Sequence, residues 1–276
     1  MKNKGLVCFF SVLILLSVGG VAFAGALETF TGEKGEVRVA GGTAHITVMK
    51  EAATRIMKHN PDIHISVGGG GSGAGIKQVG EGLIDIGNSG RKAKEDEISR
   101  YGLQMFKWAI DGVAIVVNPV NKVRSLSQEQ VAAIYAGTIT SWQEVGGEDR
   151  KINIYTRDEA SGTRAVFWKK ALAKGSVAKN ANFVVSNGAM KAVVSQDPYA
   201  IGYVSIGHMN ETLAGVAFNT IEPTLANVQS GKYPIARGLY SNTKGEPVGL
   251  VKKVIDYLFT DEGQEIVAQK GFIPVR

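Results

Sequence analysis

The sequence predicts an α/β protein with largely parallel sheets. Short apolar segments typical of strands alternate with segments whose apolar residues recur at helical spacing. Beyond the first two dozen residues, about 250 remain, which can bury one large core or the cores of two lobes. Two extended segments, 105–118 and 236–241, would let the chain pass from one lobe to the other and return.

The first 24 residues have the pattern of a secretory signal. Lys2 and Lys4 precede an apolar run at 6–18, and Ala22-Phe23-Ala24 matches the small-x-small pattern of a cleavage site. The apolar run is too short for a lasting membrane span. We therefore expect export to the periplasm with cleavage after Ala24. Cys8 is the only cysteine and lies inside this segment, so the mature chain should contain no disulfide.

The segment from 37 to 88 predicts three strands separated by two helices. In chain order these are a strand at 37–40, a helix at 43–57, a strand at 63–67, a short helix at 76–80 and a strand at 84–88. A helix between two strands returns the chain to the start of the next strand, which favours parallel pairing.

The same alternation continues after the extended segment 105–118. The later elements are a helix at 127–135, a strand at 152–157, a helix at 163–173, a strand at 199–205 and two helices at 251–259 and 263–270. The two crossings would divide the chain into a first lobe of residues 25–111 and 236–276 and a second lobe of residues 112–235.

Three places combine glycine with hydroxyl residues at the expected start of a helix. They are Gly41-Gly42-Thr43-Ala44, Gly71-Ser72-Gly73-Ala74-Gly75 and Ala160-Ser161-Gly162-Thr163. The first N–H groups of a helix have no partner within it, and together with the helix dipole they attract anions. An ordinary helix cap explains each place alone, whereas three in one chain favour an oxyanion site.

Arg157 stands four residues before Ser161 and adds a permanent positive charge to the third place. A guanidinium can bind two oxygens of an oxyanion at once. Glu159 is expected to hold this guanidinium in position. A surface position on the strand is the alternative for an isolated arginine, and the neighbouring Ser161-Gly162-Thr163 favours the binding role.

These motifs resemble those of the periplasmic phosphate-binding proteins of ABC importers, and the resemblance extends over the whole mature chain. It implies two α/β lobes with a hinge and mixed, mostly parallel sheets. It also implies a binding protein, not an enzyme, that captures inorganic phosphate between its lobes and delivers it to the permease subunits. We expect a monomer without a cofactor. The residues that correspond to the phosphate ligands of the family are Thr43, Ala44, Ser72, Arg157, Ser161, Gly162 and Thr163.

The sequence departs from the family pattern at two positions of the expected site. Ala44 lacks a hydroxyl that many members have there, so it can offer only its backbone N–H. Many members carry an aspartate where this chain has Gly90, and another branch has serine followed by arginine there. Monohydrogen phosphate carries a proton that needs an acceptor, whereas sulfate carries none. The missing carboxylate should therefore weaken discrimination between the two. Gly90 and Arg91 are further candidates for the site, and Arg91 would be a second cation unless it is a solvated loop residue.

Three other functions remain open at this point. Sulfate, tungstate or molybdate would suit the same donors. A phosphatase-like secreted enzyme is disfavoured, because the segment 70–74 lacks the last glycine of a nucleophile elbow. A receptor or adhesion module of the same fold is the third. The four histidines show no metal-binding spacing and no basic run is dense enough for nucleic acid, so neither partner is expected.

Overall fold

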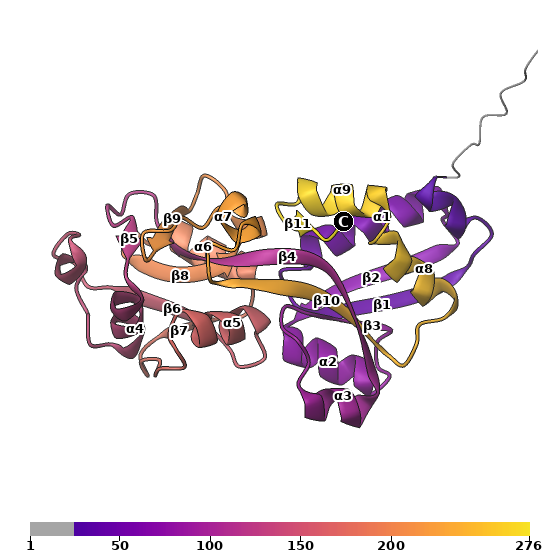
Figure 1. Cartoon of the computed structure of the whole chain (residues 1–276), viewed down its shortest axis with the longest axis horizontal. Coiled ribbons are helices and arrows are strands. Elements are labelled where there is room, and N and C mark those ends of the chain that lie inside the picture. Colours follow the sequence, from indigo (N-terminus) through magenta and orange to yellow (C-terminus); the bar gives the residue numbers. More distant parts are fainter. Residues whose placement is uncertain (1–24) are drawn as a thin grey trace, which may run out of the picture.

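The computed structural model describes residues 25–276, which form two α/β lobes joined by two long strands (Figure 1). The predicted signal sequence lies outside the described residues. The strands run in the order β2-β1-β3-β10-β4-β8-β6-β7 across both lobes. No helix within residues 25–276 is long and apolar enough to cross a membrane. The two-lobed α/β architecture expected from the sequence is confirmed.

The first lobe is built on three parallel strands. β1 (Gly35–Gly41) pairs in parallel with β2 (Ile63–Gly70) on one side and with β3 (Ile86–Ser89) on the other. Val37 and Val39 of β1 are buried, whereas Arg38 is exposed and Ala40 is partly exposed, the alternation expected for a strand. The helical elements are η1 (Ala26–Phe30), α1 (Ile46–His59), α2 (Ser72–Gly80), α3 (Glu95–Tyr101), α8 (Gly249–Tyr257) and α9 (Asp261–Gln269).

These helices cover both faces of the first sheet. In Figure 1, α1 and α9 lie on one side of the strands, and α2 and α3 lie on the other. One buried cluster joins Val48 and Ile56 of α1 to Ile266 of α9. A second cluster places Ile76 and Val79 of α2 on the opposite face. The ends of the strands and the starts of α1 and α2 are thereby held at the edge that faces the second lobe.

Two antiparallel strands connect the lobes. β4 (Leu103–Val117) has 15 residues, and β10 (Ala236–Lys244) returns beside it. Residues 103–112 of β4 pair with β10, and residues 113–117 pair with β8 (Ala200–Ser205) in the second lobe. The apolar character of β4 follows from burial on both of its faces. The expected crossings at 105–118 and 236–241 therefore exist.

The second lobe packs helices around an aromatic core. Its strands are β5 (Ser125–Leu126), β6 (Asn153–Arg157), β7 (Asn182–Val184), β8 and β9 (Ala214–Phe218), and β11 (Ile273–Pro274) pairs with β4. Its helical elements are α4 (Gln128–Ala136), η2 (Trp142–Val145), α5 (Gly162–Lys170), α6 (Asn187–Gln196), η3 (Ile206–His208) and α7 (Leu225–Gln229). The rings of Phe167 and Tyr203 stack with centroids 4.1 Å apart, which fixes α5 against β8.

The sheet is mixed in a regular way. Pairs in the outer parts of the sheet, such as β1 with β2 and β6 with β7, are parallel, and the pairs that β4 and β10 make are antiparallel. Buried clusters lie on either side of the crossing, one drawn mainly from residues 30–109 and 239–272 and the others from residues 113–235. The lobe boundaries at 111/112 and 235/236 stay a prediction.

Candidate anion-binding site

A small space of about 180 Å³ lies between the lobes beside the crossing strands. All seven expected ligand residues line it, although they are spread over 121 positions of the sequence from Thr43 to Thr163, and Gly90 lines it too. The full lining is Gly42, Thr43, Ala44, His45, Gly71, Ser72, Gly90, Arg157, Ser161, Gly162, Thr163 and Arg237.

Two helix starts from different lobes meet at this space. α2 begins at Ser72, and α5 begins at Gly162 after its cap Ser161. The N–H of Gly73 donates to the carbonyl of Ala160 across the lobes at 2.9 Å. Gly71 has φ 89°, which favours glycine, and a Cβ there would lie 2.8 Å from the same carbonyl oxygen. The positive ends of two helices therefore point toward one space.

The third expected helix start has a different structure. α1 begins at Ile46, so Thr43 and Ala44 precede the helix. The chain first makes a turn in which the N–H of His45 donates to the carbonyl of Gly42 at 3.2 Å. The expectation that helix 43–57 starts at Thr43 was wrong by three residues, because this turn follows β1. Thr43 and Ala44 still line the space, but as turn residues.

Three hydroxyl groups at the site are set up as donors. The Oγ1 of Thr43 accepts from Nδ2 of Asn187 at 3.0 Å, and the Oγ of Ser72 accepts from the N–H of Gly90 at 2.9 Å. The Oγ of Ser161 accepts from the N–H of Arg164 at 3.2 Å. None of these three hydroxyl groups donates its proton within residues 25–276, so each proton is available for a ligand oxygen.

Arg157 supplies a buried cation at the end of β6. The residue is 1% exposed, and its Nη2 donates to the carbonyl of Val185 at 3.0 Å. Its Nε and Nη1 are buried and have no hydrogen-bond partner among residues 25–276. Burial lowers the pKa of this guanidinium, which nevertheless stays charged at neutral pH. A buried cation with two free donors is costly unless an anion binds there.

Glu159 and Arg91 do not have the roles expected from the sequence. The Glu159 side chain is 92% exposed, and its nearest cation is Arg164 at 3.9 Å. The residue follows the end of β6 in a turn that points to solvent, so Val185, not Glu159, holds Arg157. Arg91 lies outside the lining and donates to both carboxylate oxygens of Glu97 at 2.7 Å. Arg91 is therefore not the second cation of this space.

The second cation is Arg237, which the sequence analysis missed. It lies on β10 directly opposite Asp111 of β4. Its Nε and Nη2 are each 2.8 Å from Oδ2 of Asp111, and its Nη1 donates to the carbonyl of Gly90 at 3.4 Å. Asp111 is fully buried and accepts from Ser205 through its other oxygen at 2.9 Å. The available sequence signal was an acidic residue, Asp111, within the apolar segment 105–118 and an arginine, Arg237, in the segment 236–241.

Two histidines are neutral at neutral pH: His45 in the lining and the partly buried His208, which lies outside it. His45 lines the space, and its ring nitrogens lie 3.1 Å from the carbonyl of Gly42 and 3.2 Å from that of Ser89. Burial, and next the charge of Arg237, lower the pKa of His45 to about 3. Burial likewise lowers the pKa of His208 to about 4. The positive charge of the lining therefore comes from its two guanidinium groups.

The depressed histidine pKa values predict acid sensitivity. A histidine whose folded pKa is lowered contributes stability above its unfolded pKa of 6.5, and this contribution is lost as the pH falls toward the folded value. Each histidine should remove about 1.4 kcal/mol of unfolding free energy per pH unit below that point. Denaturant titrations of ligand-free protein between pH 6.5 and 4.5 should show a shallower decline for His45→Asn than for the wild type. The same change at the exposed His64 should leave the slope unaltered, and equal slopes for both variants would contradict this assignment.

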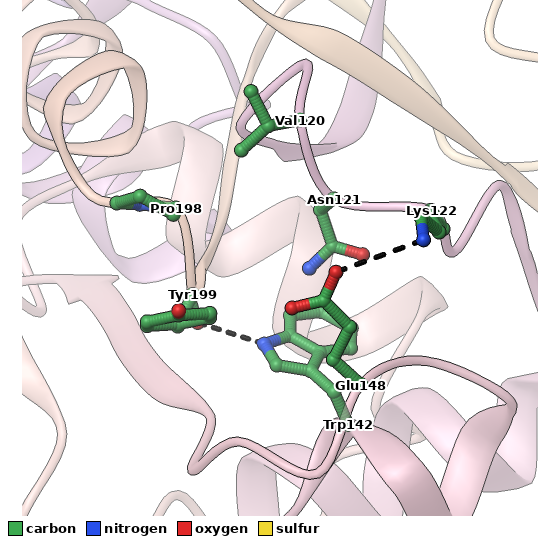
Figure 2. A pocket seen from close by; sticks show the side chains of 7 residues that line it. All are labelled: Val120, Asn121, Lys122, Trp142, Glu148, Pro198 and Tyr199. Carbon is green, nitrogen blue, oxygen red and sulfur yellow. Dashed lines mark hydrogen bonds and ion pairs between the residues drawn. The ribbon is translucent and has the colours of Figure 1, made fainter.

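A larger hollow lies in the second lobe, beyond the end of β4 (Figure 2). It measures about 400 Å³ and is lined by Val120, Asn121, Lys122, Trp142, Glu148, Pro198 and Tyr199. Its two charged side chains, Lys122 and Glu148, pair with each other at 3.8 Å. The Trp142 indole donates to the carbonyl of Tyr199 at 2.9 Å. This hollow offers no unpaired buried cation, so the smaller space is the candidate anion site.

Comparison with known proteins agrees with this geometry. The model of the PBP superfamily domain matches residues 28–262. The phosphate-binding protein PstS of Bacillus subtilis (strain 168) is 37% identical over 244 residues, which cover 87% of this chain and 81% of that protein. PstS of Borreliella burgdorferi is 28% identical over 253 residues, covering 87% of this chain and 90% of that protein.

Two solved structures resemble the protein over most of its length. One is a phosphate ABC transporter substrate-binding protein of Clostridium perfringens with bound phosphate, with a TM-score of 0.83, 32% identity and coverage of 88% of this chain and 100% of that chain. The other is an ABC-type phosphate transport receptor of Vibrio cholerae, with a TM-score of 0.71, 32% identity and coverage of 86% and 99%. These are binding proteins and receptors, in agreement with the expectation that the chain is not an enzyme. The chain belongs to the PBP superfamily and, within it, to the family of the phosphate-binding proteins PstS.

Proposed function

We propose that the protein is an extracytoplasmic solute-binding protein that captures inorganic phosphate between its lobes and delivers it to an ABC importer. The observation that carries this proposal is Arg157, a buried guanidinium with two free nitrogens in a space lined by further donors. The names of the relatives from Bacillus subtilis and Clostridium perfringens support phosphate as the ligand.

The donors suit a small tetrahedral oxyanion held by both lobes. We assign the ligand contacts of the first lobe to Thr43, Ala44 and Ser72. Those of the second lobe are assigned to Arg157 and the segment 161–163. A ligand that contacts both lobes favours the closed arrangement through its differential affinity for the two states. The space is narrow and lined mostly by short side chains and backbone, which suits a small anion better than a larger organic ligand.

Sulfate, tungstate and molybdate are the second candidates, because the described lining contains no aspartate or glutamate. The proton of monohydrogen phosphate would then be accepted by a backbone carbonyl, for example that of Gly90 or Gly42, or by a hydroxyl oxygen of the lining. Competition tests this point: phosphate should remain bound in a moderate excess of sulfate, although less selectively than in relatives with an aspartate. Complete displacement of phosphate by equimolar sulfate would favour the alternative ligand.

We further propose that the protein is a periplasmic monomer that works with the permease subunits of an ABC importer. The signal-like residues 1–24 support export, with cleavage after Ala24. The intact mass of the exported protein should correspond to residues 25–276. A mass that includes residues 1–24, or a lipid-modified amino terminus, would contradict this processing.

A further inference from the structure

Arg237 lines the anion site together with Arg157, although it is not part of the sequence motifs described above. Its side chain is 3% exposed and lines the same space of about 180 Å³. Two guanidinium groups in one small space repel each other, and the charge of Arg237 contributes to lowering the pKa of Arg157. Asp111 pairs with Arg237, whereas Arg157 forms no ion pair within residues 25–276, although the neighbouring Asp158 charge partly offsets the lowering of its pKa. The lining therefore keeps an uncompensated positive charge in the absence of an anion.

The absence of a side chain at Gly90 makes room for this arginine. A Cβ at residue 90 would lie 2.6 Å from Nη1 of Arg237 and 3.0 Å from its Cζ. Gly90 does not have a positive φ, so its backbone conformation does not require glycine. Glycine is needed at position 90 because the guanidinium of Arg237 lies where a side chain would begin.

The pairing of Arg237 leaves part of its guanidinium free for a ligand. Asp111 lies directly across β4 from Arg237 and takes its Nε in a hydrogen bond at 2.8 Å. Nη2 lies 2.8 Å from the same carboxylate oxygen but is buried without a properly oriented hydrogen bond among residues 25–276. Nη1 has one contact, the 3.4 Å bond to the carbonyl of Gly90. Asp111 thus fixes the orientation of the group without using all of its donors.

We infer that Arg237 is a second guanidinium that binds the oxyanion, oriented by Asp111 and admitted to the site by the missing side chain at Gly90. This inference rests on the proposed function. In place of an aspartate at residue 90, this site has the Arg237 guanidinium next to Gly90. The carboxylate of Asp111 on β4 pairs with this guanidinium. The site then recognises the charge of the anion more than a proton on it. The competing explanation is that Arg237 only ties β10 to β4.

Removing both charges of the pair separates these explanations. Arg237→Gln alone would leave the buried Asp111 carboxylate without its counterion and could unfold the protein. The double variant Asp111→Asn/Arg237→Gln avoids this and leaves the net charge unchanged, so any loss of affinity reports a lost contact. Calorimetric titration with inorganic phosphate should give a roughly ten- to hundredfold weaker affinity. Sulfate, if it binds the wild type, should weaken by a similar factor.

Two further variants test the geometry. Gly90→Ala keeps both charges but displaces the guanidinium, so phosphate affinity should fall. Arg237→Lys keeps the charge beside Asp111 but replaces the planar fork with a point charge, so its affinity should lie between those of the wild type and the double variant. The matched control is Arg38→Gln/Asp85→Asn, which removes a guanidinium–carboxylate pair on the surface of the first lobe. This control should bind phosphate like the wild type.

The outcomes distinguish the inference from the proposed function. If the folded double variant binds phosphate as tightly as the wild type, Arg237 is a structural tie and the inference fails. If the double variant does not fold, unchanged phosphate affinity in Gly90→Ala overturns the inference instead. A folded wild type that binds neither phosphate nor sulfate would overturn the proposed function and this inference with it.

Discussion

Arg157→Ala should weaken phosphate binding about thirtyfold or more, since removing one partner of a buried charged contact costs roughly 2–5 kcal/mol. Arg157 is almost fully buried, and two of its nitrogens face no partner within residues 25–276. The change removes a charge-assisted contact that the remaining hydroxyl and N–H donors cannot replace. Calorimetric titration with phosphate measures the loss directly.

Arg91→Ala is the matched control for this change. Arg91 directly follows Gly90 of the lining in the sequence, but its guanidinium pairs with Glu97 outside the lining. The control should change phosphate affinity by less than about threefold, because its effect on the ligand is indirect. Equal losses for the two variants would show that Arg157 does not contact the ligand.

Gly162→Ala should weaken phosphate binding about ten- to a hundredfold, because overpacking a close contact typically costs 1–3 kcal/mol. A Cβ at Gly162 would collide with the Oγ of Ser72 and lie 3.0 Å from its Cβ. Gly162 starts α5 in the second lobe, and Ser72 starts α2 in the first. The added methyl group would therefore keep the lobes apart without disturbing either core.

Gly188→Ala provides the comparison for that variant. Gly188 also lies in the first turn of a helix, α6, but a Cβ there would find its nearest neighbour, the Oγ of Ser186, at 3.7 Å. Both variants should unfold at the temperature of the ligand-free wild type, and only Gly162→Ala should lose affinity and fail to become more compact with phosphate in small-angle scattering. Full affinity in Gly162→Ala would show that closure does not need this close approach.

The parts of the site that are local in sequence could be predicted from it. Arg157 and the segment 161–163 belong to one strand, turn and helix, so their spacing already brings them to one end of β6. The glycine-rich segments after β1 and β2 pointed to the same edge of a parallel sheet. The crossing strand at 105–118 was visible because a strand buried on both faces is continuously apolar.

The parts that depend on register or side-chain direction could not be predicted. Asp111 and Arg237 are 126 positions apart and meet only because β4 and β10 pair in one particular antiparallel register. Glu159 is two residues from Arg157, but the strand has ended there and its side chain points to solvent. Asn187 orients the Thr43 hydroxyl from a helix that the sequence analysis did not foresee.

A direct titration of the exported, ligand-free protein with phosphate and then with sulfate tests the whole account. At neutral pH and moderate ionic strength, calorimetry should show one phosphate bound per chain, with sulfate binding more weakly. This stoichiometry is expected because Thr43, Ser72, Arg157 and Gly162 line one small space that would take one anion. Tight binding of sulfate or tungstate without phosphate would contradict the choice of ligand and leave the oxyanion site standing. Binding of none of these anions would contradict both.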